Sequence, residues 1–399
     1  MSTTTLDKVK TIKTLNNIAE SGLNVFNKGN FTVDNDSENP DAYVLRSFNM
    51  HAMEFGDNLK AIARAGAGVN NIPVERCTEQ GIVVFNTPGA NANAVKEMIL
   101  TTLIASSRNL FAGVAWARTL ENEGSEIPKL VEAGKKQFVG KEIKGKTLGV
   151  IGLGAIGALV ANDALALGMD VIGFDPFISV DTAWHLSSTV QRAMTIEQLF
   201  ANADYITVHV PLTDETRAMF NKDTFAIMKE DAYILNFSRG ELVNETDMEA
   251  ALESGKVGKY ITDFPNETVM KMKNTVPIPH LGASSRESEE NCAVMAAYQV
   301  KEFLETGNIK NSVNFPNTNL PYTGKARVAV FHKNVPNMVG QITQAISSYE
   351  LNIADMVNRS RGEYAYTMID IDNEVNSEIG PKLEETIKQI NGVVTTRII

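Results

Sequence analysis

Three residues in the second half of the chain have types and positions suited to acid–base chemistry on a carboxylate. Arg239 follows the strand-like run Ala232–Asn236, and Glu267 and His280 lie in the next two polar loops. In open α/β sheets, loops that follow strands form the binding site. An arginine can bind a carboxylate through two parallel hydrogen bonds, and a histidine beside an acid can exchange a proton with a substrate. The set predicts a substrate clamp with an acid–base pair, although each residue alone is more often structural.

A glycine motif earlier in the chain joins a predicted strand to a predicted helix. It has the form G-x-G-x-x-G and consists of Gly152, Gly154, Ala155, Ile156 and Gly157, with a leucine between the first two glycines. Glycines permit the tight turn and let the helix N-terminus approach a pyrophosphate. Asp175 follows the next strand, where its carboxylate can bind a ribose diol and would repel a 2′-phosphate. The motif predicts an NAD site; the alternative is a glycine-rich turn without a ligand.

Such motifs require a layered α/β frame, and short apolar runs alternating with helical ones predict it. In the first region, strand-like runs at Ala42–Leu45 and 81–85 precede a helical pattern at 93–112 and a polar, solvated segment at 121–146. The second region has predicted strands at Thr147–Ile151, Asp170–Phe174, 205–210 and Ala232–Asn236. Both regions predict doubly wound parallel sheets.

The C-terminal part of the chain has a different pattern. Residues 307–323, with two prolines and five asparagines, predict a linker. Beyond it the predicted order is βαββαβ, a ferredoxin-like arrangement. Its predicted strands are 327–331, 353–360, Tyr364–Ile371 and 393–399, and its predicted helices are 341–349 and 379–390.

Composition excludes several classes of protein. With 399 residues and 43 % hydrophobic residues, the chain is globular and large enough for two or three domains. Its net charge of −11 argues against nucleic-acid or anionic-membrane binding. The two cysteines lack metal-type spacing, so no metal site or disulfide framework is predicted. The N-terminus lacks a secretory pattern and no apolar run could span a membrane, so a soluble, cytoplasmic protein is predicted.

Several segments occur in the order found in the D-2-hydroxyacid dehydrogenases, so the chain resembles that family from about Asp41 to Pro316. Besides the glycine motif with Asp175, they are Asn86-Thr-Pro-Gly-Ala-Asn91, Val208-His209-Val210-Pro211-Leu212, Ser238-Arg239-Gly240 and Pro279-His280-Leu-Gly-Ala-Ser284. The run Arg64-Ala-Gly-Ala-Gly68-Val-Asn-Asn71 resembles most the phosphoglycerate-oxidising branch.

The resemblance implies an interrupted substrate domain and a reaction cleft. Residues 1–97 and 286–318 would form a flavodoxin-like substrate domain, with a Rossmann-type NAD-binding domain, 98–285, inserted between them. Residues 319–399 would be a linker and a regulatory domain. The implied reaction is NAD-dependent oxidation of 3-phospho-D-glycerate to 3-phosphooxypyruvate, the first step of L-serine synthesis. Alternatives are a glyoxylate or hydroxypyruvate reductase and a non-catalytic NAD-sensing scaffold.

The resemblance also implies residue roles. Arg239 would bind the substrate carboxylate, His280 would take the hydroxyl proton, and Glu267 would orient the imidazole. The family usually has Asp-Val-Phe-x-x-Glu-Pro here, whereas this chain has a loop one residue shorter, Asp263-Phe-Pro-Asn-Glu267-Thr. His209 is an alternative base, but it matches a cofactor-loop position. Further implied NAD contacts are His209, Val210, Pro211, Phe237, Ser238, Asp263, Gly282 and Ala283.

For the substrate phosphate, the resemblance implies an anion site made of guanidinium groups and backbone N–H donors. Its members would be Arg46, Ser47, Arg64, Gly66, Ala67, Gly68 and Asn91. The alternative is that both arginines are ordinary surface ion-pair partners.

The segments around Val328–Ile342 and Leu351–Ile353 resemble an ACT domain, a small amino-acid-binding module. In this branch two such modules pair and bind L-serine at their interface, which implies a homodimer or homotetramer with serine as an inhibitory effector. The matching residues are His332, Asn334 and Asn352. Asn337 stands where a glycine usually follows the proline, and asparagine tolerates the positive φ expected there. The alternative is a pairing module without a ligand.

Overall fold

The computed structural model describes residues 9–27, 29–323, 325–373 and 375–399. The chain divides into two compact units. One consists of Met1–Asn91 and Glu289–Ile399, and the other is Ala92–Ser288. The second unit therefore interrupts the first along the chain.

The first unit contains a parallel sheet with the order β2-β1-β3-β4-β5. Its strands are β1 (Lys10–Leu15), β2 (Phe31–Val33), β3 (Ala42–Leu45), β4 (Ala61–Arg64) and β5 (Val83–Phe85), accompanied by the short helices α1 (Glu20–Leu23) and α2 (Val74–Glu79). The long helix α11 (Arg286–Thr306) presents small and aromatic residues at helical spacing to this core. A Cβ on Gly22 would lie 2.7 Å from Ala293, so α1 approaches α11 closely.

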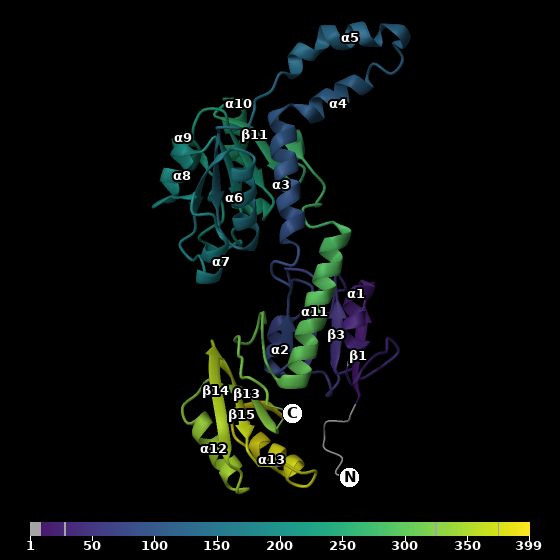
Figure 1. Ribbon diagram of the computed structural model, residues 1–399, viewed down its shortest axis with the longest axis vertical. Coiled ribbons are helices and arrows are strands. Elements are labelled where there is room, and N and C mark those ends of the chain that lie inside the picture. The colour runs from purple at the N-terminus through teal and green to yellow at the C-terminus, as the bar shows by residue number, and fades with distance from the viewer. Residues whose placement is uncertain (1–8, 28, 324, 374) are drawn as a thin grey trace. The chain divides into compact units, whose positions relative to one another are not determined.

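The second unit contains a parallel sheet with the order β12-β11-β10-β9-β6-β7-β8. Its strands are β6 (Thr147–Ile151), β7 (Asp170–Phe174), β8 (Gln191–Arg192), β9 (Tyr205–Val208), β10 (Ala232–Asn236), β11 (Val257–Thr262) and β12 (Thr275–Pro277). The helices α3 (Ala92–Ser107) and α6 (Ala155–Ala166) pack in one core, and α8 (Ile196–Asn202), α9 (Lys222–Ile227) and α10 (Glu245–Glu253) pack in another (Figure 1). The predicted doubly wound class is confirmed.

One predicted helix is interrupted. The helical pattern at 93–112 ends at Ser107, because Asn109 adopts φ +51° and α4 (Leu110–Arg118) begins after it. The segment predicted to be polar and solvated contains the helix α5 (Ile127–Gly134). Figure 1 shows α4 and α5 projecting from their sheet, and none of their residues is buried. Among the described residues, no single helix could cross a membrane; only the bent pair α3–α4 has the length and composition.

The third sheet is antiparallel and has the order β14-β15-β13-β16. Its strands are β13 (Arg327–Lys333), β14 (Ile353–Arg361), β15 (Tyr364–Ile371) and β16 (Val393–Ile398). The helices α12 (Met338–Ser347) and α13 (Ile379–Lys388) share a core on one face of it (Figure 1). The predicted ferredoxin-like order is confirmed.

The other face of the third sheet packs into the core that contains the parallel sheet of the first unit and α11. Phe331 and Tyr366 stack with their ring centroids 4.3 Å apart, and Phe315 lies 4.5 Å from Phe331. Phe303 of α11 joins the same cluster. The third sheet therefore shares a core with the parallel sheet of the first unit.

The segment predicted as a linker, 307–323, is folded into that core, so the linker prediction is wrong. The Asn314 side chain accepts from the Val84 N–H and donates to the Ile82 carbonyl, at 2.9 Å each. Asn308 accepts from the Leu320 N–H. In this segment, asparagine side chains make hydrogen bonds with backbone groups that lack a neighbouring strand. Composition alone does not distinguish such a segment from a solvated linker.

Candidate active site

The glycine motif forms the turn between β6 and α6, where strand order reverses in the second sheet. Gly152 has φ +85°, and a Cβ there would lie 2.7 Å from the His209 carbonyl. A Cβ on Gly157 would lie 1.9 Å from the Gly152 oxygen, whereas nothing stands within 4 Å of one on Gly154. The open approach at Gly154 and the uncapped start of α6 fit a pyrophosphate group.

Asp175 directly follows the neighbouring strand β7 and fixes this turn. One carboxylate oxygen accepts from the Leu153 N–H and the other from the Phe177 N–H, both at 2.8 Å. A carboxylate has about four acceptor sites, so Asp175 keeps capacity for a ribose diol. Its position beside the glycine motif fits NAD.

Replacing Asp175 by alanine is expected to weaken NAD binding and to narrow the preference for NAD over NADP. The change removes ribose acceptors, the repulsion of a 2′-phosphate and the hydrogen bond to Leu153 together. The ratio of kcat/KM for the two cofactors measures the effect, and Asp175→Asn is the control because it keeps one acceptor. An unchanged ratio in Asp175→Ala would place the ribose elsewhere.

His209 lies behind the glycine turn and is half-buried. Its Nε2 is 3.0 Å from the Thr207 hydroxyl, and its Nδ1 has no partner among the described residues. Burial lowers the pKa of His209 to about 3. So low a pKa makes the His209 imidazole a weak proton acceptor, which argues against His209 as the base and favours its cofactor-loop position.

The candidate catalytic residues follow three neighbouring strands. Arg239 follows β10, Asp263 follows β11 and His280 follows β12; because these strands are parallel and adjacent, their carboxyl ends lie at one edge. Arg239 and His280 are exposed, and the Phe264 ring lies 4.8 Å from the imidazole. An exposed cation and an exposed imidazole at one edge can receive a small acid.

Asp263 is the buried carboxylate of this edge, 1 % exposed. One oxygen accepts from the Gly282 N–H at 3.0 Å, and the other has no partner among the described residues. Burial raises the pKa of Asp263, while the Gly282 N–H and the charges of His280 and Arg239 oppose the rise. The unsatisfied oxygen fits an amide donor such as the nicotinamide carboxamide.

The structure does not pair Glu267 with His280, as the predicted acid–base pair requires. Its side chain is 87 % exposed and its carboxylate pairs with Lys271 at 2.6 Å. No hydrogen bond joins Glu267 to His280 within the parts of the chain that the structure describes. The shortened loop is fixed by Asn266, which bonds to Glu245 and to the Val269 N–H. Asp263 is instead the carboxylate whose charge acts on both His280 and Arg239.

In the first unit, the predicted anion-binding residues lie on two adjacent strand ends. Arg46 and Ser47 follow β3, and Arg64 ends β4, with the Gly66–Ala67–Gly68 loop after it. The Arg46 guanidinium pairs with Glu289 at 2.7 Å. The Arg64 guanidinium donates to the carbonyls of Arg46 and Gly68, and Asn86 donates to Ala67. Asn91 directly precedes α3.

Sequence reasoning missed Asn16, which supports the same loop. Asn16 directly follows β1 with φ +86°, and its side-chain oxygen accepts from the N–H groups of Ser47 and Phe48. The available signal was an asparagine pair directly after a strand, which is a turn signal.

The predicted effector residues lie at opposite ends of the third sheet. His332, 2 % exposed, bonds to Thr367 at 2.8 Å, and Asn334 donates to the Gly362 carbonyl. Asn352 precedes β14 and donates to Asp372. One copy of the chain therefore does not bring the three together. Asn337 has φ +67°, as expected for a residue in a glycine position.

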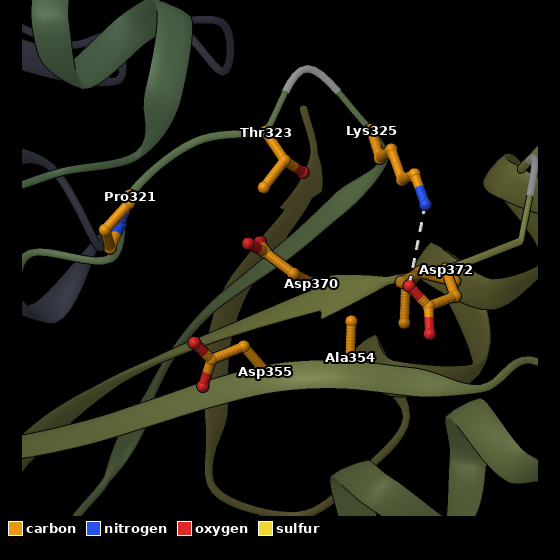
Figure 2. A pocket seen from close by; sticks show the side chains of 8 residues that line it. Pro321, Thr323, Lys325, Ala354, Asp355, Asp370 and Asp372 are labelled. Atoms are coloured by element: carbon orange, nitrogen blue, oxygen red, sulfur yellow. Dashed lines mark ion pairs between the residues drawn. The ribbon is translucent and has the colours of Figure 1, made fainter.

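A pocket opens beside Asn352 at this end of the sheet (Figure 2). Its lining is acidic and includes Asp355, Asp370 and Asp372, with Pro321, Thr323, Lys325, Ala354 and Ile371. Asp370 is paired with Arg327, and Asp372 lies 3.6 Å from Lys325. None of the predicted site residues lines it, and its charge does not suit an anionic substrate.

Comparison with known proteins relates both units to one family. Residues 100–282 match the NAD-binding domain of D-isomer specific 2-hydroxyacid dehydrogenases. The chain is 36 % identical to hydroxypyruvate reductase of Thermotoga maritima, over 67 % of this chain and 85 % of that protein. It is 34 % identical to D-3-phosphoglycerate dehydrogenase of Methanocaldococcus jannaschii, over 79 % of this chain but 59 % of that protein. It thus spans about half the length of the relatives it matches first.

Solved structures support the fold. D-mandelate dehydrogenase of Rhodotorula graminis aligns with a TM-score of 0.65 at 21 % identity, covering 78 % of this chain and 99 % of that one. NAD+-bound 3-phosphoglycerate dehydrogenase of Entamoeba histolytica aligns with a TM-score of 0.57 at 26 % identity, covering 78 % and 100 %.

Proposed function

Because the chain belongs to the D-isomer specific 2-hydroxyacid dehydrogenase family, we propose that it oxidises 3-phospho-D-glycerate to 3-phosphooxypyruvate with NAD, the first step of L-serine synthesis. The observation that carries the choice of substrate is Arg46, a guanidinium held at a strand end by a fixed loop. Phosphate binds guanidinium through paired hydrogen bonds. Relatives named D-3-phosphoglycerate dehydrogenase support the same choice.

In the proposed mechanism, residues of the second unit act on the carboxylate and on C2. Arg239 binds the carboxylate and polarises the C2 oxygen. His280 removes the hydroxyl proton as C2 is oxidised and returns it in the reverse reaction. Asp263 orients the His280 loop by accepting a hydrogen bond from the Gly282 N–H, and its carboxylate lies close enough to His280 and Arg239 to interact with them electrostatically. The glycine motif and Asp175 would hold NAD, which would accept the hydride from C2.

A panel of 2-oxo acids tests the proposal against its main alternative. With NADH, 3-phosphooxypyruvate is expected to be reduced with a higher kcat/KM than glyoxylate or hydroxypyruvate. A preference for hydroxypyruvate would favour the reductase, a reading supported by the Thermotoga relative. Failure to oxidise NADH with any of them would favour a non-catalytic protein.

Regulation by L-serine is part of the proposal, through the ferredoxin-like module. His332 and Asn352 lie at opposite ends of one sheet, so antiparallel pairing of two copies along the edge strand β14 would bring one of each together. The positive φ of Asn337 preserves the loop between β13 and α12. The ligand would act by favouring one arrangement of subunits.

Millimolar L-serine is expected to inhibit the enzyme, and Asn352→Ala is expected to relieve the inhibition without abolishing catalysis. The coupling between sites is typically about 1–3 kcal/mol. Titration calorimetry on the full chain measures binding, because this module shares a core with the rest of its unit. If serine gives neither heat nor inhibition, the module serves only for assembly.

We further expect a homodimer or homotetramer in the cytoplasm. The helix α4 exposes Leu110, Phe111 and Val114, and the nine-residue edge strand β14 is largely exposed. Two exposed surfaces on different units suit a tetramer with two kinds of interface, and the use of one of them suits a dimer. Cys77 and Cys292 are buried free thiols, which suits a reducing compartment.

A further inference from the structure

The loop that presents Arg46 has a backbone fixed by three side chains. Asn16 accepts from the Ser47 and Phe48 N–H groups at 3.0 and 2.7 Å. Arg64 and Asn71 both donate to the Arg46 carbonyl, at 2.9 and 3.2 Å, and Asn71 donates to the Phe48 carbonyl at 2.7 Å. Four backbone groups of three residues are thus satisfied, so the part of Arg46 that can move is its side chain.

The Arg64 guanidinium is part of this frame. It donates to the Gly68 carbonyl at 2.5 Å. A Cβ on Gly66 or Gly68 would lie 3.1 or 3.2 Å from its terminal nitrogen, so the glycine loop closes around the guanidinium. These contacts make Arg64 a positioning residue for the loop and leave Arg46 as the guanidinium that faces a ligand.

The Arg46 side chain has a specific partner. Its terminal nitrogen lies 2.7 Å from the Glu289 carboxylate, and the two side chains are 44 % and 47 % exposed. Glu289 lies in the first turns of α11, where the helix dipole favours a negative charge. The carboxylate is therefore anchored on a long helix, and it would remain in place when Arg46 turns to another anion.

We propose that Glu289 tunes the affinity for the substrate phosphate, by holding Arg46 until a dianionic group of the substrate displaces it. This inference rests on the proposed function. An ion pair exposed this much is weak, and a phosphate dianion binds a guanidinium more strongly than one carboxylate does. An uncharged hydroxymethyl tail cannot displace Glu289, so the arginine charge stays neutralised for unphosphorylated acids.

The same geometry determines whether removing the Glu289 charge raises or lowers the affinity for the phosphorylated substrate. After displacement, the Glu289 carboxylate lies near the phosphate and repels it. Removing its charge should therefore strengthen binding of the phosphorylated substrate, since Arg46 no longer has a competing anion. Binding of D-glycerate, which lacks the phosphate, should not change.

Glu289→Gln tests this with little change in shape. The KM for 3-phospho-D-glycerate is expected to fall about three- to tenfold, as for the loss of one screened charge a few ångströms away. The kcat value and the KM for D-glycerate should stay within about twofold. Glu287→Gln is the matched control, because it removes the same charge two positions away on α11 and should leave both KM values unchanged.

The inference is overturned if the KM for 3-phospho-D-glycerate is unchanged or raised, if both substrates shift equally, or if Glu287→Gln has the same effect. Calorimetry with inorganic phosphate separates this from the proposed function. If the wild-type protein does not oxidise 3-phospho-D-glycerate, the proposed function fails. Tighter phosphate binding by Glu289→Gln than by wild type would still support the role of Glu289, and equal binding would refute it.

Discussion

His280→Ala is expected to lower kcat by about 10²–10⁴-fold, the usual contribution of a general acid–base group, while NADH binding stays near the wild-type value. The imidazole is exposed at the carboxyl edge of the second sheet, beside Arg239 and the buried Asp263. It is therefore accessible to a substrate hydroxyl. Steady-state kinetics give kcat, and NADH fluorescence titration gives cofactor affinity.

The matched variant is His280→Asn, which keeps a hydrogen-bonding side chain but cannot exchange a proton near neutral pH. It should lose nearly as much activity as His280→Ala. A variant at His280 that keeps most of its activity would contradict the assignment and would return attention to His209, despite the burial that lowers the pKa of His209 to about 3.

Arg327→Ala is expected to destabilise the protein by about 3–5 kcal/mol, as found when one partner of a buried ion pair is removed. The guanidinium is fully buried and bonds both oxygens of Asp370, at 2.5 and 2.9 Å. It also donates to the carbonyls of Thr306 and Pro321. The substitution would leave a buried carboxylate and two carbonyls without this donor.

Urea unfolding followed by circular dichroism measures the change in the free energy of unfolding. The double variant Arg327→Met with Asp370→Leu should recover much of the loss, because apolar pairs can replace buried ion pairs. Lys382→Ala, which removes an exposed partner of Glu378, serves as the control and should leave stability unchanged. A wild-type-like Arg327→Ala would mean that water enters this site readily.

Strands were the most predictable part of the fold. Thr147–Ile151, Asp170–Phe174 and Tyr364–Ile371 have the predicted bounds, because a short apolar run between turn residues allows little else. The helix break at Asn109 was not predictable, since this residue with left-handed φ makes hydrogen bonds to the distant residues Val139 and Lys259. The prediction of a linker at residues 307–323 was wrong for a related reason, because Asn308 and Asn314 bond to backbone groups that are distant in the sequence.

The candidate site was predictable where the contacting residues lie close together in the sequence and form a known motif. The glycine turn and Asp175 are local, and the structure places them in contact. Asn16 acts on residues about thirty positions away, and Glu289 reaches Arg46 from another part of the chain. Such pairings arise from the topology of the fold, and the sequence has no characteristic spacing of residues that would indicate them. The position of Glu267 depended on the register of a shortened loop, which residue types do not determine.

The selectivity of the wild-type enzyme for the phosphate tests the central claim most directly. The quantity to measure is kcat/KM with NAD for 3-phospho-D-glycerate and for D-glycerate, on the same preparation. A guanidinium that reads phosphate through charge-assisted hydrogen bonds should give a ratio of about 10² or more, since each such bond contributes roughly 1.5–3 kcal/mol. A ratio near one, or a preference for D-glycerate, would contradict a phosphoglycerate dehydrogenase.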